Sequence, residues 1–166
     1  IKMMGVVRDI SEEKASAKQL QKLAHHDPLT GLPNRLVLEE RLGKALERAR
    51  ANASRVALVF VDLNGFKAIN DQHGHAAGDR VLVTTATRLK KTLRESDTVA
   101  RIGGDEFVLI LEGLTQGKSL QDEAHDICEK IFAGLAPPIS IGSTLQHIGT
   151  SLGVAVFPDH GPSMDT

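Results

Sequence analysis

The chain has no tryptophan or tyrosine, only one cysteine, and almost no net charge. A single cysteine, Cys128, excludes an intrachain disulfide framework and predicts a reducing, cytoplasmic compartment. The 20 basic and 21 acidic residues leave a net charge of -1, and no basic run stands out. The five phenylalanines form no stacking platform for single strands, so we expect no nucleic-acid partner.

Long apolar runs are also missing from the sequence. No stretch is long and apolar enough to cross a bilayer, and no signal peptide is visible. The chain begins at Ile1 rather than at methionine. We therefore interpret it as a piece of a larger protein, and a membrane anchor elsewhere in that parent stays open. Its 166 residues suffice for one compact domain with a short appendage.

Residues 98–111, TVARIGGDEFVLIL, carry the most informative pattern in the sequence. Two short runs of β-forming residues flank Gly103-Gly104, which predicts a β-hairpin with a two-residue turn. Two carboxylates, Asp105 and Glu106, follow at once. Glycines let a bulky anion approach the backbone, and adjacent carboxylates repel unless a cation or proton compensates them. A nucleotide–metal site and a surface turn with solvated acids explain this stretch alone equally well.

A second stretch, residues 58–82, favours the nucleotide–metal site. An apolar strand ends in Asp62, and four polar side chains follow it: Lys67, Asn70, His75 and Asp79. A third motif, DPLTGLPNR, covers residues 27–35. With the intact GGDEF sequence at residues 103–107, the three motifs resemble the GGDEF family, the diguanylate cyclases. The resemblance runs from about Ala24 to the end of the chain.

The alternation of helical and strand patterns predicts an α+β fold, with helices flanking one sheet. The family resemblance implies a mostly antiparallel sheet with a ferredoxin-like core, similar to nucleotidyl cyclase and polymerase palm domains. We expect the 55–61 strand to be central and covered on both faces. The expected helices are 35–51, 76–93 and 119–133, and the expected strands are 55–61, the hairpin 98–111, 139–141, 144–148 and 150–157. In the 119–133 helix, the apolar pattern predicts an inward face of Ala124, Ile127, Cys128, Ile131 and Phe132.

Three segments make up the expected domain organisation. Residues 1–10 are similar to the end of a PAS sensor domain, and residues 11–24 predict a signalling helix or a solvated helix that frays. Residues 25–166 resemble a GGDEF domain that stops before its final helix. In the family that helix carries a lysine and an arginine for the triphosphate, so we expect this fragment to bind GTP weakly and to turn over poorly.

The resemblance implies a reaction and a metal site. Diguanylate cyclases condense two GTP molecules into cyclic di-GMP and two pyrophosphates at a homodimer interface, using Mg²⁺ or Mn²⁺. Hard cations of this kind take oxygen ligands. By resemblance, the metal ligands here are Asp62, the Leu63 carbonyl, Asp105 and Glu106. The resemblance also makes Asp105 and Glu106 catalytic, with Asp105 accepting the hydroxyl proton.

The family's substrate contacts carry over to the four polar side chains of the second stretch and to Gly103 and Gly104. Asn70 and Asp79 match the guanine readers, because a carboxylate can accept from N1–H and N2–H₂ of guanine and adenine lacks this pattern. Lys67 matches a phosphate contact and His75 a position near the ribose. A solvated lysine and a histidine packed in a turn are the alternatives for these two residues.

Three further predictions concern residues outside the catalytic motifs. Arg94 and Asp97 match the family's site for product inhibition by cyclic di-GMP, although a helix-end charge pair would look the same. Asp27 and Arg35 are expected to form an ion pair that holds the loop between them. Asn64 stands where the family more often has aspartate, and we expect little loss from it.

Other function classes stay open at this stage. The main alternative is a catalytically silent module that binds GTP or cyclic di-GMP and regulates an attached effector, such as a phosphodiesterase. A dimerisation module with a vestigial site, or a cyclase with a single-nucleotide product, fits the motifs less well. An upstream sensor domain is the expected regulatory partner.

Overall fold

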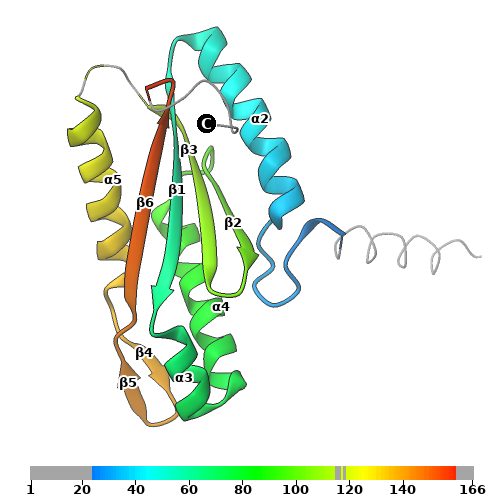
Figure 1. The fold of residues 1–166 in the computed structure, drawn as a ribbon, viewed down its shortest axis with the longest axis vertical. Coiled ribbons are helices and arrows are strands. Elements are labelled where there is room, and N and C mark those ends of the chain that lie inside the picture. The colour runs from blue at the N-terminus through cyan, green and yellow to red at the C-terminus, as the bar shows by residue number, and fades with distance from the viewer. Residues whose placement is uncertain (1–23, 115–116, 118, 160–166) are drawn as a thin grey trace, which may run out of the picture.

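The computed structural model describes residues 24–114, 117 and 119–159, and a four-stranded sheet forms its centre (Figure 1). The strand order is β2-β3-β1-β6, and every neighbouring pair is antiparallel. The strands are β1 (Arg55–Asn64), β2 (Thr98–Gly103), β3 (Glu106–Leu114) and β6 (Gly149–Phe157). A separate hairpin pairs β4 (Ile139–Ile141) with β5 (Thr144–Gln146). The predicted α+β class with an antiparallel sheet is confirmed.

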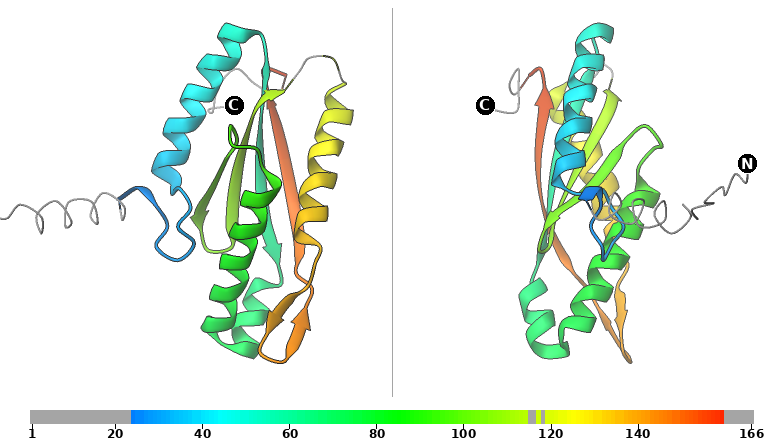
Figure 2. Two further views of the ribbon diagram at one scale, coloured as in Figure 1. Left: turned by 180° about the vertical axis from the view of Figure 1, so that it is seen from behind. Right: turned by 90° about the vertical axis from the view of Figure 1, so that its right-hand side faces the viewer.

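Helices cover the two faces of this sheet unequally (Figure 2). The helices are α2 (Arg35–Asn52), α3 (Phe66–His73), α4 (His75–Thr92) and α5 (Leu120–Leu135). The larger core cluster packs α4 and α5 against one face. A smaller cluster packs α2 against β2, β3 and the first half of β1 on the opposite face. Within the described part of the chain, no helix is both long and apolar enough to cross a membrane.

Local capping explains why α2 and α5 begin where the sequence predicts. Asn34 precedes α2, and its side-chain oxygen accepts a hydrogen bond from the Val37 N–H at 3.2 Å. Ser119 does the same for α5 by accepting from the Asp122 N–H at 3.1 Å. These caps satisfy backbone donors that a helix leaves unpaired. The segment predicted at residues 1–10, and all but Ala24 of the helix predicted at residues 11–24, lie outside the described residues.

The coverage predicted for β1 is wrong for its second half. Phe60 is 49% exposed, and burial alternates along the strand from Val59 to Asn64. The residues of β1 that contact the α2 cluster are Val56 and Leu58. Because α2 ends its contact with β1 there, one face of the second half remains open among the described residues.

The inward face predicted for α5 is also partly wrong. Ile127 and Ile131 are buried as expected, but Phe132 is 41% exposed, and Ala124 and Cys128 are only partly buried. The buried stripe runs through Glu123, Ile127, Ile131 and Leu135. The prediction counted only apolar residues as inward, so it left out Glu123 and turned the predicted buried face toward Cys128 and Phe132. Partial burial, with the charge of Glu129, raises the pKa of the Cys128 thiol.

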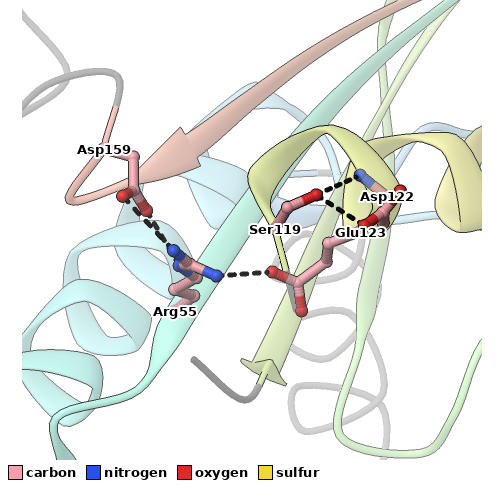
Figure 3. Close-up of polar contacts among 5 residues, drawn as sticks. All are labelled: Arg55, Ser119, Asp122, Glu123 and Asp159. Carbon is pink, nitrogen blue, oxygen red and sulfur yellow. Dashed lines mark hydrogen bonds and ion pairs between the residues drawn. The ribbon is translucent and has the colours of Figure 1, made fainter. Parts of the chain in front are cut away.

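Arg55 explains how Glu123 is accommodated in that stripe (Figure 3). The Arg55 guanidinium contacts Glu123 Oε2 at 3.3 Å and Asp159 Oδ2 at 2.9 Å. A buried carboxylate is costly unless it is paired. The Arg55 cluster (Arg55, Glu123 and Asp159) thus joins the start of β1 to α5 and to the segment that follows β6.

The loop before α2, the Asp27 loop (residues 27–33), is held differently from the prediction. Asp27 Oδ1 pairs with Arg101 Nη1 at 2.9 Å, whereas Arg35 is exposed at the start of α2. The predicted Asp27–Arg35 ion pair is therefore wrong. Asp27 Oδ2 accepts from the Thr30 N–H at 2.7 Å and from Thr30 Oγ1 at 2.6 Å. The loop lies beside the end of β2 (Figure 1), which brings Arg101 within reach.

Asp27→Asn should therefore destabilise the fold in a pH-dependent way. Partial burial would raise the pKa of Asp27, but the hydrogen bonds from Thr30 and Arg101 outweigh it and hold the pKa below 3.8. A lowered folded-state pKa adds stability that is present above about pH 4 and is lost as the pH falls through the folded-state value. We expect a loss of about 1–3 kcal/mol at neutral pH, which shrinks in strong acid.

Urea denaturation across this pH range measures the effect. Glu40→Gln, which removes an exposed ion pair with Lys44, is the control and should change the free energy of unfolding little. A difference between wild type and Asp27→Asn that stays constant from neutral to strongly acidic pH would contradict the assignment.

Candidate active site

Two carboxylates face each other across neighbouring strands at one end of the sheet. Asp62 on β1 stands opposite Glu106 on β3 in the antiparallel register. Residues directly opposite in such a pair project from the same face and lie close together. Both side chains line an open pocket of about 240 Å³, together with Phe60, Ser151 and Gly153. The pocket lies on the half of the sheet face that α2 leaves open.

The signature turn (Gly103–Glu106) differs by one residue from the predicted one. Gly103 pairs with Glu106, so Gly104 and Asp105 are the central residues. Gly104 has a φ of +49°, a conformation that residues with a side chain rarely adopt. Asp105 is half-buried in the turn, outside the lining of the Asp62–Glu106 pocket, whereas Glu106 is exposed.

The end of β1 carries two more residues of the predicted site. The Leu63 side chain is buried in the larger core cluster, so only its main chain is available to a ligand. Asn64 Oδ1 accepts a hydrogen bond from Ser151 Oγ at 2.9 Å. This amide therefore links β1 to β6 beside the acidic pair.

The remaining predicted substrate contacts come from two helices at the same end of the sheet. Lys67 and Asn70 lie on α3, which begins only two residues after β1 ends. The short connection keeps both residues at the end of β1 that carries Asp62. Helix α4 then returns along the sheet from His75 and carries Asp79 in its second turn (Figure 1). Lys67, His75 and Asp79 are exposed and Asn70 is half-buried.

Gly78 is a site residue that the sequence reasoning missed. A Cβ at this buried position would lie 2.0 Å from Asn70 Oδ1. The Asn70 side chain therefore rests against the backbone of α4, one residue before Asp79. A glycine inside a helical pattern indicates such a close approach, but nothing in the sequence says which residue approaches.

The acidic pair suits a hard cation that also binds substrate. In the described residues, no group of three or more His, Cys, Asp and Glu side chains is placed to hold a metal ion. Mg²⁺ is usually bound by one or two protein carboxylates, with water and substrate phosphates completing its shell. Asp62 and Glu106 fit that incomplete donor set.

Arg94 and Asp97 lie in the loop between α4 and β2. Asp97 Oδ2 accepts from the Arg94 N–H at 2.9 Å, and Asp97 Oδ1 accepts from the Glu112 N–H at 3.2 Å. Both residues line a pocket of about 310 Å³ that also includes Asp126 and Lys130 of α5. The structure thus brings the two predicted residues together and gives Asp97 a role in closing the loop.

This second pocket is remote from the acidic pair. Glu106 and Glu112, which line the two pockets, stand six residues apart on β3. At about 3.3 Å per residue, the separation along the strand is roughly 20 Å. A small molecule in one pocket therefore does not reach the other within the same chain.

Comparisons with known proteins agree with this arrangement. Residues 24–166 match the family model described as "Diguanylate cyclase, GGDEF domain". Diguanylate cyclase TpbB from Pseudomonas aeruginosa is 44% identical over 153 residues, which cover 91% of this chain and 33% of TpbB. The bifunctional diguanylate cyclase/cyclic di-GMP phosphodiesterase MucR from the same species is 40% identical over 144 residues, covering 87% of this chain and 20% of MucR.

A solved structure extends the agreement to the fold. The crystal structure of a sensory box/GGDEF family protein from Caulobacter crescentus has a TM-score of 0.78 at 38% identity, with 85% of this chain and 88% of that chain covered. The chain spans a third or less of the length of TpbB and MucR. From the matched family model and these relatives, the chain belongs to the GGDEF domain family of diguanylate cyclases.

Proposed function

We propose that the protein condenses two GTP molecules into cyclic di-GMP and two pyrophosphates. The observation that carries this proposal is the Asp62–Glu106 pair on an open sheet face beside the intact signature turn. The name of TpbB, a diguanylate cyclase at 44% identity, supports it. Each site holds one GTP, so the reaction takes place between two copies of the chain that face each other.

The chemical step joins the 3′-hydroxyl of one GTP to the α-phosphate of the other. It requires in-line positioning, neutralisation of phosphate charge and removal of the hydroxyl proton. In our assignment, Asp105 accepts that proton from its place in the turn. Asp62, Asp105, Glu106 and the Leu63 carbonyl would hold Mg²⁺ or Mn²⁺, which when bound supplies positive charge at the phosphates.

Selection of GTP falls to the two helices after β1. Asp79 accepts from N1–H and N2–H₂ of guanine, and Asn70 pairs with a remaining polar edge. Lys67 meets a phosphate as a point charge, and His75 lies near the ribose. Gly103 and Gly104 leave room for phosphates against the turn. Adenine would leave Asp79 unpaired, which penalises ATP.

Product inhibition is assigned to Arg94 and Asp97. The exposed Arg94 side chain can stack on a guanine and bond its Hoogsteen edge. Each Asp97 oxygen already accepts one backbone N–H, and each retains capacity for another donor such as guanine N1–H. The roughly 20 Å separation along β3 makes such inhibition indirect within one chain. An upstream sensor domain is the proposed source of activation.

A catalytically silent regulatory module is the second candidate function. It is favoured by the cyclic di-GMP phosphodiesterase NbdA from Pseudomonas aeruginosa, which is 37% identical over 142 residues and whose name gives no cyclase activity. In such a module, GTP or cyclic di-GMP would bind without turnover and act on an attached effector. Only the cyclase forms cyclic di-GMP from GTP, so detection of this product distinguishes the two functions.

Incubation with GTP and Mg²⁺, followed by chromatographic separation of products, tests the proposal. Asp105→Asn should lower the rate of cyclic di-GMP formation by about 10²–10⁴-fold, because the amide cannot accept the hydroxyl proton. Asp71→Asn, an exposed change on α3, is the matched control and should keep the wild-type rate. Tight GTP binding without product in wild type would establish the silent module instead.

The dependence of rate on protein concentration tests the need for two copies. At high dilution, the rate of product formation should rise with the square of the protein concentration, because only dimers turn over. At higher concentration, where dimers predominate, the dependence should become linear. A rate that stays linear down to the lowest dilution would contradict the two-copy site.

Gly78→Ala tests guanine recognition without weakening the fold. Alanine favours the helix by up to about 1 kcal/mol, but its Cβ would displace the Asn70 side chain. We expect an unchanged or higher melting temperature together with a KM for GTP that is about 10-fold higher. Gly43→Ala on α2, where a Cβ meets nothing within 4 Å, should stabilise the helix and leave KM unchanged. An unchanged KM in Gly78→Ala would remove Asn70 from the guanine site.

A further inference from the structure

Arg101 makes an unusual set of contacts on either side of the signature turn. Its Nε and Nη2 atoms donate to the Gly104 carbonyl at 3.0 and 2.7 Å. Its Nη1 atom donates to Asp27 Oδ1 at 2.9 Å. Its backbone N–H donates to the Pro33 carbonyl at 3.0 Å. The side chain is only 13% exposed, so one guanidinium joins the Asp27 loop to the turn.

The signature turn needs such a restraint because its own backbone is conformationally free. Glycine populates more backbone conformations than any other residue, and two glycines precede the proposed proton acceptor. The ladder between β2 and β3 is also irregular between Arg101 and Gly103. The Gly104 carbonyl shares a rigid peptide plane with the Asp105 nitrogen. Two hydrogen bonds to that carbonyl therefore orient the peptide that leads into Asp105.

The other end of the guanidinium is fixed by the Asp27 loop. Thr30 occupies Asp27 Oδ2 with two hydrogen bonds, which leaves Oδ1 toward Arg101. The loop is closed by hydrogen bonds from the Asp27 N–H to the Leu32 carbonyl and from the Gly31 N–H to the Asp27 carbonyl. Leu32 is fully buried in the larger core cluster. The carboxylate that holds Arg101 thus stands on a loop anchored in the core.

From these contacts we infer that Arg101 is a positioning residue for the cyclase reaction, which holds the signature turn in its reactive conformation through the Gly104 carbonyl. The inference rests on the proposed function for its kinetic consequence. Lysine keeps the charge, but its single ammonium group cannot bond the carbonyl twice and reach Asp27 as a planar fork does. Arg101→Lys therefore tests the geometry apart from the charge.

The first measurement is independent of activity. In ¹⁵N relaxation experiments, the Gly104 and Asp105 amides of wild type should show order parameters near those of rigid backbone, about 0.85. In Arg101→Lys we expect values below about 0.6 at these two amides, with the rest of the sheet unchanged. Equal order parameters in the two proteins would overturn the inference, whatever the protein catalyses.

The second measurement is steady-state kinetics with GTP. Arg101→Lys should lower kcat by about 10- to 100-fold, as misplacement of a reacting group does, and should change KM less than about twofold. Asp27→Asn should also lower kcat. The double variant should be no slower than Arg101→Lys alone, because both changes release the same group. A rise in KM with unchanged kcat, or additive losses, would contradict positioning.

A control separates positioning from general loss of stability. Asp159→Asn removes an ion pair with Arg55 of the same 2.9 Å length, at the opposite end of β1. Asp159→Asn should lower the free energy of unfolding by about as much as Asp27→Asn does, and it should leave kcat unchanged. If wild type forms no cyclic di-GMP, the proposed function fails, whereas the order parameters still decide whether Arg101 holds the turn.

Discussion

The register between β1 and β3 is the constraint on which the candidate site depends. Successive side chains of a strand point to opposite faces, so a slip by one residue would turn Asp62 toward the helices. The register is fixed by apolar residues on the covered face, where Val61 stands opposite Phe107 and Val59 opposite Leu109. Burial on one face therefore determines which acids meet on the other. The chemistry of the open face is a consequence of packing on the hidden one.

The two ends of the sheet have different roles. At the start of β1, the Arg55 cluster joins three segments, and α2 covers the sheet. At the far end of β1, the cover stops, and the acidic pair is reached by solvent. Stability and binding are thus separated along one strand. This separation lets the site keep exposed charged groups that a core could not contain.

Local patterns predicted most of the elements. Asn34 and Ser119 cap their helices through contacts three residues away, so the sequence alone contains both partners. The hairpin and the motif after Asp62 were also predicted from short stretches. The motif after Asp62 lies at one end of the sheet because α3 and α4 follow β1 in the chain. The signature turn lies at the same end because β3 pairs with β1.

Contacts between distant segments were beyond such patterns. Arg101 lies 74 residues from Asp27, and the nearer Arg35 was a more obvious partner on sequence grounds. The need for glycine at position 78 becomes clear only when the structure places the Asn70 side chain against it. Phe60 looks like a core residue in the sequence, but it is exposed because α2 does not cover that part of β1. In each case the missing information is which surface another element covers. The periodicity of a sequence shows which residues are hydrophobic, whereas the exposure of a residue depends on which other element packs over it.

The contact between Arg101 and the signature turn involves a main-chain acceptor rather than a side chain. The acceptor is the main-chain carbonyl of Gly104, and neither hydrogen bond from Arg101 involves the side chain at position 105. The shape of the turn and the chemistry that it presents are therefore separable properties of this fold. A different acid or amide at position 105 would inherit the same scaffold, so the identity of the reactive group can change while its placement is retained.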